Sequence, residues 1–393
     1  MRFSRSGVSG QSVPLTQVRR AQTWQIGVTG PPLSRERDGR PNPITVEIGR
    51  HDRAARGYRR RMPLTRSLSD ATVVITGASS GIGAATAYAL AQRGADVVLA
   101  ARTGSALRRV AASCRELGGR ALVVPTDVTD PEAVEQLAAR AVAEFGRIDA
   151  WVNNAAVGTV GLFDEIPVAE FRRVVDVNLL GAVYGTRAAL PWLTAAGGGV
   201  LVNNASVLAE VAMPYQSAYN ATKHAIRGLA DTVRQELRVT GRGNISICTV
   251  LPATIDTPFF RHAANHTGRE LTPPPPVYPP EMVAETIVKL LRRPRREAYA
   301  GGAARLIGLQ WRLAPALAER VMGWYTARTQ FGPGVRADST GAVFTPDSAA
   351  ERTDGWSGRR GQVLRLTAAV GLAAGTAVGT VAAISRRSRG GRP

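Results

Sequence analysis

The sequence is poor in the residues from which disulfide frameworks and metal centres are built. Its 393 residues include two cysteines, Cys114 and Cys248, and four histidines. Two lone cysteines in so long a chain exclude a disulfide framework and fit a reducing, cytoplasmic compartment. The scattered histidines and cysteines lack the spacing of a metal site, so no bound metal is expected.

Long apolar runs are also scarce. No apolar stretch of signal-peptide length lies near the start, so a secretory signal peptide is not expected. One uncharged run, at 366–384, is flanked by arginines and approaches the ~20 residues that span a bilayer. Its Ala, Gly, Val and Thr are weakly apolar, although glycines every four residues allow close helix packing. Two interpretations stay open for 363–385: a C-terminal membrane helix that anchors the cytoplasmic domain, or a soluble apolar tail.

The 30 acidic residues are outnumbered by 50 lysines and arginines, so the net charge is +20. The excess is concentrated at the ends: 1–61 holds thirteen arginines and four acids, and 351–393 holds eight arginines and two acids. Such tails bind nucleic acid or anionic lipid, or are merely solvated. No nucleic-acid motif with interleaved aromatics accompanies them, so no nucleic-acid partner is expected. Without apolar periodicity, 1–61 is predicted to be a disordered extension, and Met62 is a candidate for the native start. The polar segment 331–362 is predicted to be a linker.

From about residue 70, apolar runs alternate with helix-forming segments. Strands are predicted at 72–75, 96–100, 121–125, 150–152, 200–203 and 246–251, and helices at 82–93, 104–118, 131–145, 168–195 and 217–240. This alternation is typical of a parallel sheet covered on both faces, with ligands at the carboxyl ends of its strands. The predicted fold is a Rossmann-like, doubly wound α/β/α domain over 62–330.

A glycine-rich turn follows the first predicted strand and opens the first helix. Glycine allows a phosphate to approach without meeting a Cβ, and the helix start attracts an anion. The turn therefore suits a nucleotide pyrophosphate, although glycine-rich turns are common. Its candidate binding residues are Gly77, Ser79, Ser80, Gly81, Ile82 and Gly83.

Four further features follow downstream in a fixed order. Asn153-Asn154-Ala155 follows a strand, Asn178 lies in Asp-Val-Asn-Leu, Ser206 precedes Tyr219 by thirteen residues, and Lys223 follows four residues later. With the glycine turn, this set resembles the single-domain form of the short-chain dehydrogenase/reductase family over about residues 70–300. The sequence departs from the family pattern at Ala156, Ala205 and Ala253, none of which replaces a reacting group.

The resemblance implies a nicotinamide cofactor, and charge indicates which one. The second predicted strand ends without an acid and is followed by Arg102. A carboxylate there would favour NAD, whereas arginine suits the 2′-phosphate of NADP. NADP is therefore predicted and NAD is less favoured, unless Arg102 is only a solvated loop residue. The resemblance places Asp127 and Val128 beside the adenine, although Asp127 could instead be a turn acid. It also places Asn154, Ala155 and Thr257 against the cofactor.

The spacing of Tyr219 and Lys223 places both on one face of a helix. A neighbouring ammonium favours the phenolate and lowers the pKa of a tyrosine, which can then exchange a proton with a carbonyl or alcohol oxygen. The resemblance implies that Tyr219 is the acid/base, that Lys223 also binds the ribose, that Ser206 orients the substrate oxygen, and that Asn178 holds a water in a proton relay. The alternatives are a surface Tyr-x-x-x-Lys pair, a turn serine and a structural asparagine.

The C-terminal part of the domain is predicted to cover the substrate. Aromatic residues after the sixth strand, with Leu208, Met213 and Tyr215, indicate an apolar pocket or ordinary packing. An amphipathic helix at 281–293, a strand at 297–301 and a helix at 303–328 follow. In the family, such a helix and strand often contribute to dimer or tetramer contacts, so a homodimer or homotetramer is expected.

We therefore predict an NADP-dependent oxidoreductase that interconverts a carbonyl and a secondary alcohol on a small-molecule substrate, for which a lipophilic compound is one interpretation. The alternative is a non-catalytic NADP-binding sensor or a membrane-tethered scaffold. The complete set of Asn178, Ser206, Tyr219 and Lys223 argues against that alternative, because a non-catalytic role would not require these groups.

Overall fold

The computed structural model describes residues 64, 66–346 and 353–356. The predicted extension at 1–61, the alternative start at Met62 and the apolar segment at 363–385 lie outside these residues. Within the described ranges, no helix is long and apolar enough to cross a membrane.

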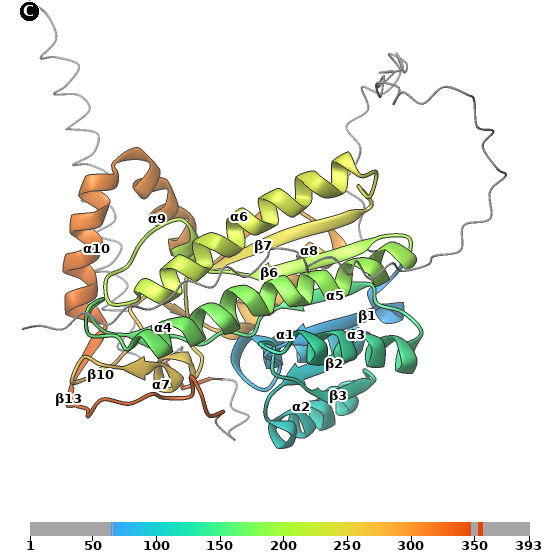
Figure 1. Ribbon diagram of the computed structural model, residues 1–393, viewed down its shortest axis with the longest axis horizontal. Coiled ribbons are helices and arrows are strands. Elements are labelled where there is room, and N and C mark those ends of the chain that lie inside the picture. The colour runs from blue at the N-terminus through green and yellow to red at the C-terminus, as the bar shows by residue number, and fades with distance from the viewer. Residues whose placement is uncertain (1–63, 65, 347–352, 357–393) are drawn as a thin grey trace, which may run out of the picture. The chain divides into compact units, whose positions relative to one another are not determined.

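Seven parallel strands form the central sheet in the order β12-β7-β6-β4-β1-β2-β3 (Figure 1). Their bounds are β1 Thr72–Thr76, β2 Asp96–Ala101, β3 Ala121–Pro125, β4 Ala150–Asn153, β6 Gly199–Asn204, β7 Ile245–Pro252 and β12 Glu297–Ala300. Most of their residues are buried, because helices cover both faces of the sheet. The predicted doubly wound fold is confirmed, together with the seventh strand expected at 297–301.

Two helical layers enclose two apolar cores. On one face lie α1 Gly81–Ala91, α2 Gly104–Glu116 and α8 Pro280–Arg292, and on the other lie α3 Pro131–Phe145, α4 Val168–Val175, α5 Gly181–Ala195 and α6 Ser217–Val239. Ile287 of α8 packs with Ile75 and Leu90 in the first core. Trp151, Leu193 and Leu201 pack in the second. The apolar side of α8 is therefore already covered within the chain.

The site is positioned by the point at which the chain changes direction across the sheet. From β1 the chain runs outward through β2 and β3 on one side, and later through β4, β6, β7 and β12 on the other. Ligands of doubly wound sheets bind at such a switch point, beyond the carboxyl ends of the strands. Short elements gather beyond these ends: η2 Asp176–Leu180, η3 Val207–Ala209, β5 Thr159–Val160, β8 Thr254–Ile255, α7 Phe259–His262, β9 Ala264–Asn265, β10 Arg269–Leu271 and β11 Val277–Tyr278. The one-turn η1 Leu68–Asp70 precedes β1.

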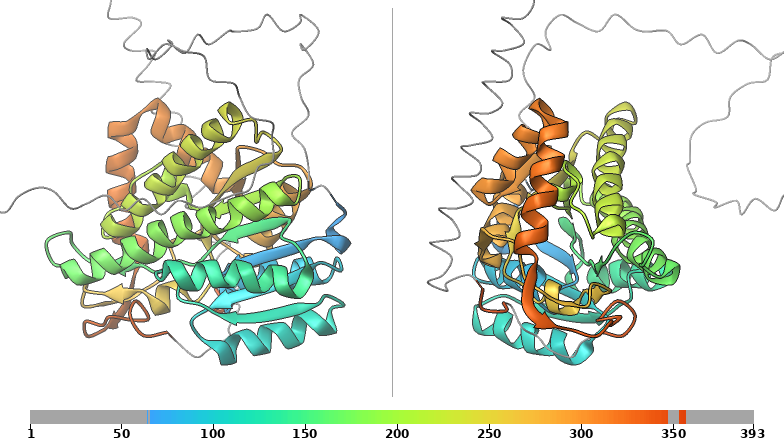
Figure 2. Two further views of the ribbon diagram at one scale, coloured as in Figure 1. Left: turned by 45° about the vertical axis from the view of Figure 1, so that its right-hand side comes forward. Right: turned by 90° about the vertical axis from the view of Figure 1, so that its left-hand side faces the viewer.

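Two predicted helices are interrupted. The helix expected at 168–195 contains η2, a π-helical turn between α4 and α5. The helix expected at 303–328 is divided into α9 Gly302–Leu313 and α10 Pro315–Thr329. Pro315 disfavours helical backbone in the residue before it, and Ala314 has φ −147° and ψ 69°. The result is the α9–α10 hairpin seen in Figures 1 and 2, which contacts β12 and η3.

The segment expected to be a linker begins with ordered structure. β13 Phe331–Val335 pairs antiparallel with β10, and Ser339 forms a bridge with Asn265. The backbone N–H of Ala342 then donates to the carbonyl of His262 (2.7 Å). We call residues 336–346 the C-terminal strap. Main-chain hydrogen bonds attach it to the substrate side of the domain, which a polar linker composition does not reveal.

His266 ties this strap to the domain. Its Nε2 lies 2.8 Å from Glu170, and its Nδ1 lies 3.5 Å from Asp338 of the strap. Burial lowers the pKa of His266, but hydrogen bonds and charge attraction from the two carboxylates outweigh burial, so the pKa is raised above 6.5. The protonated ring therefore stabilises the folded chain. That contribution is fully present below the unfolded pKa and is lost as the pH rises through the folded pKa.

We expect His266→Gln to lower Tm more at pH 6 than at pH 8.5, because the interaction lost is that of the charged ring. Thermal unfolding at both pH values measures the difference. His224→Gln, which removes an exposed histidine from α6, is the control. A loss of stability by His266→Gln that is equal at both pH values would contradict the assignment.

Candidate active site

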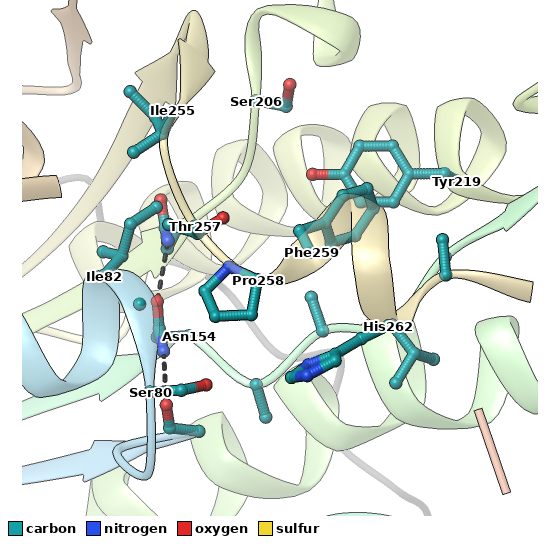
Figure 3. A pocket seen from close by; sticks show the side chains of 18 of the residues that line it. Ser80, Ile82, Asn154, Ser206, Tyr219, Ile255, Thr257, Pro258, Phe259 and His262 are labelled. Atoms are coloured by element: carbon teal, nitrogen blue, oxygen red, sulfur yellow. Dashed lines mark hydrogen bonds between the residues drawn. The ribbon is translucent and has the colours of Figure 1, made fainter. Parts of the chain in front are cut away.

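A cleft of about 300 Å³ lies at the switch point of the sheet (Figure 3). Most of the sequence-predicted site residues line it: Gly77, Ser79, Ser80, Gly81, Ile82, Arg102, Asp127, Val128, Asn154, Ala155, Ser206, Tyr219, Lys223 and Thr257. Gly83 and Asn178 are buried and do not line it. Residues separated by up to 180 positions in the sequence therefore meet at one opening, as the strand-end argument requires.

The glycine turn is packed so closely that side chains are excluded. Gly77 has φ +65°, and a Cβ there would lie 2.7 Å from the Cα of Ala155. A Cβ on Gly83 would lie 2.2 Å from the carbonyl oxygen of Gly77. The turn thus brings the start of α1 against the end of β4. This leaves a backbone-lined cradle at a helix N-terminus, the arrangement that accepts phosphate.

A chain of hydrogen bonds connects this turn to Lys223. The Nδ2 of Asn154 donates to the carbonyls of Thr76 (2.9 Å) and Gly77 (3.1 Å). The Nδ2 of Asn204 donates to the Oδ1 of Asn154 (2.8 Å). The Nζ of Lys223 donates to the carbonyl of Asn204 (2.9 Å). The turn, two strand ends and α6 therefore hold one another in place.

Asn204 lines the cleft and was missed by sequence reasoning. Asn153-Asn154 ends β4, and Asn203-Asn204 ends the neighbouring β6, with Asn153 directly opposite Asn203. Two Asn-Asn pairs at the carboxyl ends of adjacent strands were the available signal. Their side chains supply both donors and acceptors where backbone pairing stops.

Ser206, Tyr219 and Lys223 form one wall of the cleft. Burial raises the pKa of Tyr219 to about 12, and a hydrogen bond with Ser206 partly opposes this. Burial lowers the pKa of Lys223 to about 7. The Nζ of Lys223 lies 5.2 Å from the centroid of the Tyr219 ring. That Lys223 lowers the pKa of Tyr219 stays a prediction.

Asn178 lies in the π-helical turn η2 and is 1% exposed. Its Oδ1 accepts from the N–H of Val157 (2.8 Å), and its Nδ2 donates to the carbonyl of Val157 (2.9 Å) and to the Oγ1 of Thr222 (3.3 Å). Thr222 directly precedes Lys223. Asn178 therefore fixes the loop after β4 relative to the catalytic face of α6. π-Helical turns are often found at functional sites.

The strap reaches the far end of the cleft. Arg102 donates to the carbonyls of Phe344 (2.7 Å) and Ala342 (2.9 Å). Arg173 pairs with Asp127 (2.8 Å). Hydrogen bonds and charge attraction from Arg173 hold the pKa of Asp127 below its usual range, although burial opposes them. Arg102 is thus in contact with acceptors rather than solvated, and two guanidinium groups lie beside one carboxylate at the end of β2 and β3.

Aromatic side chains cover the catalytic end. The ring of Phe259 in α7 lies 5.2 Å from that of Tyr219, centroid to centroid, and 5.5 Å from that of Phe260. Figure 3 shows Phe259 and Thr257 on the same side of the cleft as Tyr219. His262, which was not expected at the site, also lines it.

The residues present fit a nicotinamide dinucleotide. The part of the glycine turn that lines the cleft, from Gly77 to Ile82 at the start of α1, would receive the pyrophosphate. Lys223 has three N–H donors, and Asn204 is the acceptor found for it among the described residues. Its remaining donors suit the hydroxyls of a ribose.

Comparison with known proteins agrees with this geometry. A sequence model of the family described as short chain dehydrogenase matches residues 71–267, half of the chain. The chain belongs to the short-chain dehydrogenase family. It is an NAD(P)-dependent oxidoreductase acting on CH–OH groups.

Three relatives illustrate the similarity of this short-chain dehydrogenase. The uncharacterized oxidoreductase YxnA of Bacillus subtilis is 39% identical over 259 residues, which cover 65% of this chain and 72% of that protein. Cis-4-hydroxycyclohexanecarboxylate dehydrogenase of Sinomonas cyclohexanicum is 37% identical, covering 57% of this chain and 90% of that protein. An alcohol dehydrogenase from Thermococcus sibiricus, solved in complex with 5-hydroxy-NADP, is 29% identical in sequence. Its structure matches with a TM-score of 0.51 over 58% of this chain and 95% of that chain.

We expect Gly83→Ala to weaken cofactor binding at least tenfold, because its methyl group would collide with the Gly77 carbonyl that shapes the turn. Titration of intrinsic fluorescence with NADPH measures the affinity. Gly228→Ala is the matched control, since that glycine is also helical and has no atom within 4 Å of its added Cβ. It should stabilise the chain by about 0.5–1 kcal/mol. Equal affinities for the two variants would refute the role given to the turn.

Proposed function

We propose that this short-chain dehydrogenase interconverts a carbonyl and a secondary alcohol with NADP(H), using Tyr219 as the acid/base. The observation that carries the proposal is the meeting of Ser206, Tyr219 and Lys223 on one wall of the cleft that begins at the glycine turn. When bound, the cofactor supplies or accepts the hydride.

Tyr219 exchanges the proton that accompanies the hydride. With a pKa of about 12, its hydroxyl is protonated at neutral pH and is ready to donate to a carbonyl oxygen during reduction. Alcohol oxidation requires the phenolate, which the positive charge of protonated Lys223 favours. Because burial lowers the pKa of Lys223 to about 7, this charge is present on only part of the molecules near neutrality.

Ser206 and Asn178 support this exchange. The hydroxyl of Ser206 accepts from the N–H of Leu208 (3.1 Å) and lies within hydrogen-bond reach of Tyr219, so a substrate oxygen placed between the two would meet both hydroxyls. Asn178 holds Thr222, and through the helix it holds Lys223. Its proposed place in a water-linked proton relay depends on the family resemblance.

Charge at the adenosine end favours NADP. β2 ends without a carboxylate, and Arg102 and Arg173 both lie there. The guanidinium of Arg102 now donates to strap carbonyls, and a 2′-phosphate is a stronger, charged acceptor for the same N–H groups. The alcohol dehydrogenase similar in structure was solved with an NADP derivative, which supports the same choice.

We expect Tyr219→Phe to reduce kcat by about 10²–10⁴-fold while NADPH affinity changes less than threefold, because the variant loses the proton donor and keeps the ring. Steady-state reduction of a small ketone, alongside NADPH titration, measures both. Tyr184→Phe removes a hydroxyl from α5, away from the cleft, and is the control. Undiminished turnover by Tyr219→Phe would overturn the assignment.

We expect Arg102→Ala to weaken NADPH binding about tenfold or more and NADH binding less than threefold, because only NADPH carries the 2′-phosphate. Side-by-side fluorescence titrations measure the ratio of the two affinities. Arg140→Ala, on the exposed side of α3, should leave the ratio unchanged. If Arg102→Ala weakens both cofactors equally, the arginine does not select NADP.

A further inference from the structure

We propose that an apolar chamber beside the catalytic cleft holds an uncharged hydrocarbon portion of the substrate. The substrate class would be medium- or long-chain aliphatic ketones and their secondary alcohols. This inference rests on the proposed carbonyl–alcohol chemistry and adds the substrate class to it.

The chamber has a volume of about 390 Å³ and lies between η3, the proline segment 274–276 and the α9–α10 hairpin. It adjoins the cleft, because six residues line both: Val207, Leu208, Met213, Ala253, Thr254 and Pro274. Val207 directly follows Ser206. A substrate whose oxygen lies at Ser206 and Tyr219 therefore has the chamber next to its carbonyl carbon.

The lining recognises hydrocarbon rather than charge. Among the described residues, no charged side chain lines the chamber. Its tyrosine hydroxyls already have partners, since the Tyr278 hydroxyl accepts from the N–H of Ala303 (3.2 Å) and the Tyr325 hydroxyl donates to the carbonyl of Pro275. A carboxylate or phosphate would lose its hydration there without compensation. An alkyl chain would gain the free energy of leaving water.

The hairpin that walls the chamber is fixed relative to the catalytic serine. Glu210, directly after η3, forms ion pairs with Arg227 (2.9 Å) and with Arg312 of α9. The hydroxyl of Tyr299 also donates to it (2.8 Å). The Glu210 side chain is 2% exposed, and these partners satisfy its buried charge. The chamber therefore has a set distance from Ser206, as a site that measures chain length requires.

Tyr219 itself belongs to the same apolar cluster. It packs with Val207, Leu208 and Val211, and the cluster extends to Trp311 and Met322 of the hairpin. The hairpin lies beyond residue 267, where the family match ends. The hairpin wall of the chamber therefore comes from a part of the chain that lies outside the family match.

The test measures binding of 2-pentanone and 2-nonanone to the full chain saturated with NADP⁺, by calorimetry. No hydride is available, so affinity is measured without turnover. We expect affinity to rise about fourfold for each added methylene, the factor that corresponds to ~0.8 kcal/mol per buried CH₂. The charged analogue 8-oxononanoate should bind at least tenfold more weakly than 2-nonanone.

Two matched variants locate the effect. Ala318 lines the chamber, whereas Ala316, two residues earlier on α10, is exposed and does not. We expect Ala318→Phe to reduce the 2-nonanone to 2-pentanone affinity ratio at least tenfold, and Ala316→Phe to preserve it. Should Ala318→Phe fail to fold, Ala303→Leu fills the chamber from the α9 side.

An affinity that does not depend on chain length would overturn the proposal, and would mean that the chamber is filled by another occupant such as a second copy or the chain's own apolar segment. An equal effect of Ala318→Phe and Ala316→Phe would also overturn it. NADPH-dependent reduction of 2-pentanone is measured separately. Its absence would refute the proposed function, whereas a flat affinity profile with intact reduction would refute only the chamber.

Discussion

The hydrogen-bonded path from the glycine turn through Asn154 and Asn204 to Lys223 is the interaction on which the active-site arrangement depends. The carboxyl ends of parallel strands leave backbone groups unpaired, and asparagine side chains supply the missing partners. The same bonds that satisfy the ends of β1, β4 and β6 also set the distance from the glycine turn to the amine of Lys223. The hydrogen bonds that stabilise the strand ends therefore also fix the relative positions of the site residues.

That constraint has an electrostatic consequence. Lys223 is held 2% exposed by its bond to a carbonyl, and no described carboxylate contributes to its pKa. Tyr219 is partly buried, and burial likewise disfavours its charged form. Burial favours the neutral form of both Tyr219 and Lys223, so the site carries little charge before a substrate binds. This environment also suits an apolar substrate chain in the adjoining chamber.

How well each part of the structure could be predicted from the sequence depended on the kind of contact that forms it. Helix α3 was predicted at its observed bounds because Asp130 caps its start, accepting from two N–H groups, and Gly146 ends it with φ +79°. The cleft residues were predictable because their side chains form spaced motifs. The strap was not, because it contacts Arg102 through main-chain carbonyls, which any residue type provides. The packing of Phe259 and the hairpin around Tyr219 was not predicted either, since it brings together segments distant in the sequence.

The chain has fifty basic residues at neutral pH, yet only two of them, Lys223 and Lys289, are lysines. Lys289 is exposed on α8, whereas Lys223 lies within the cleft with a pKa of about 7. An amine with so low a pKa is largely unprotonated at mild alkaline pH and is then nucleophilic, but only toward reagents that enter the cleft. Apart from the α-amino group, amine-directed acylation should therefore distinguish the two lysines: Lys289 reacts at the surface, and Lys223 reacts at a rate that reports access to the cleft.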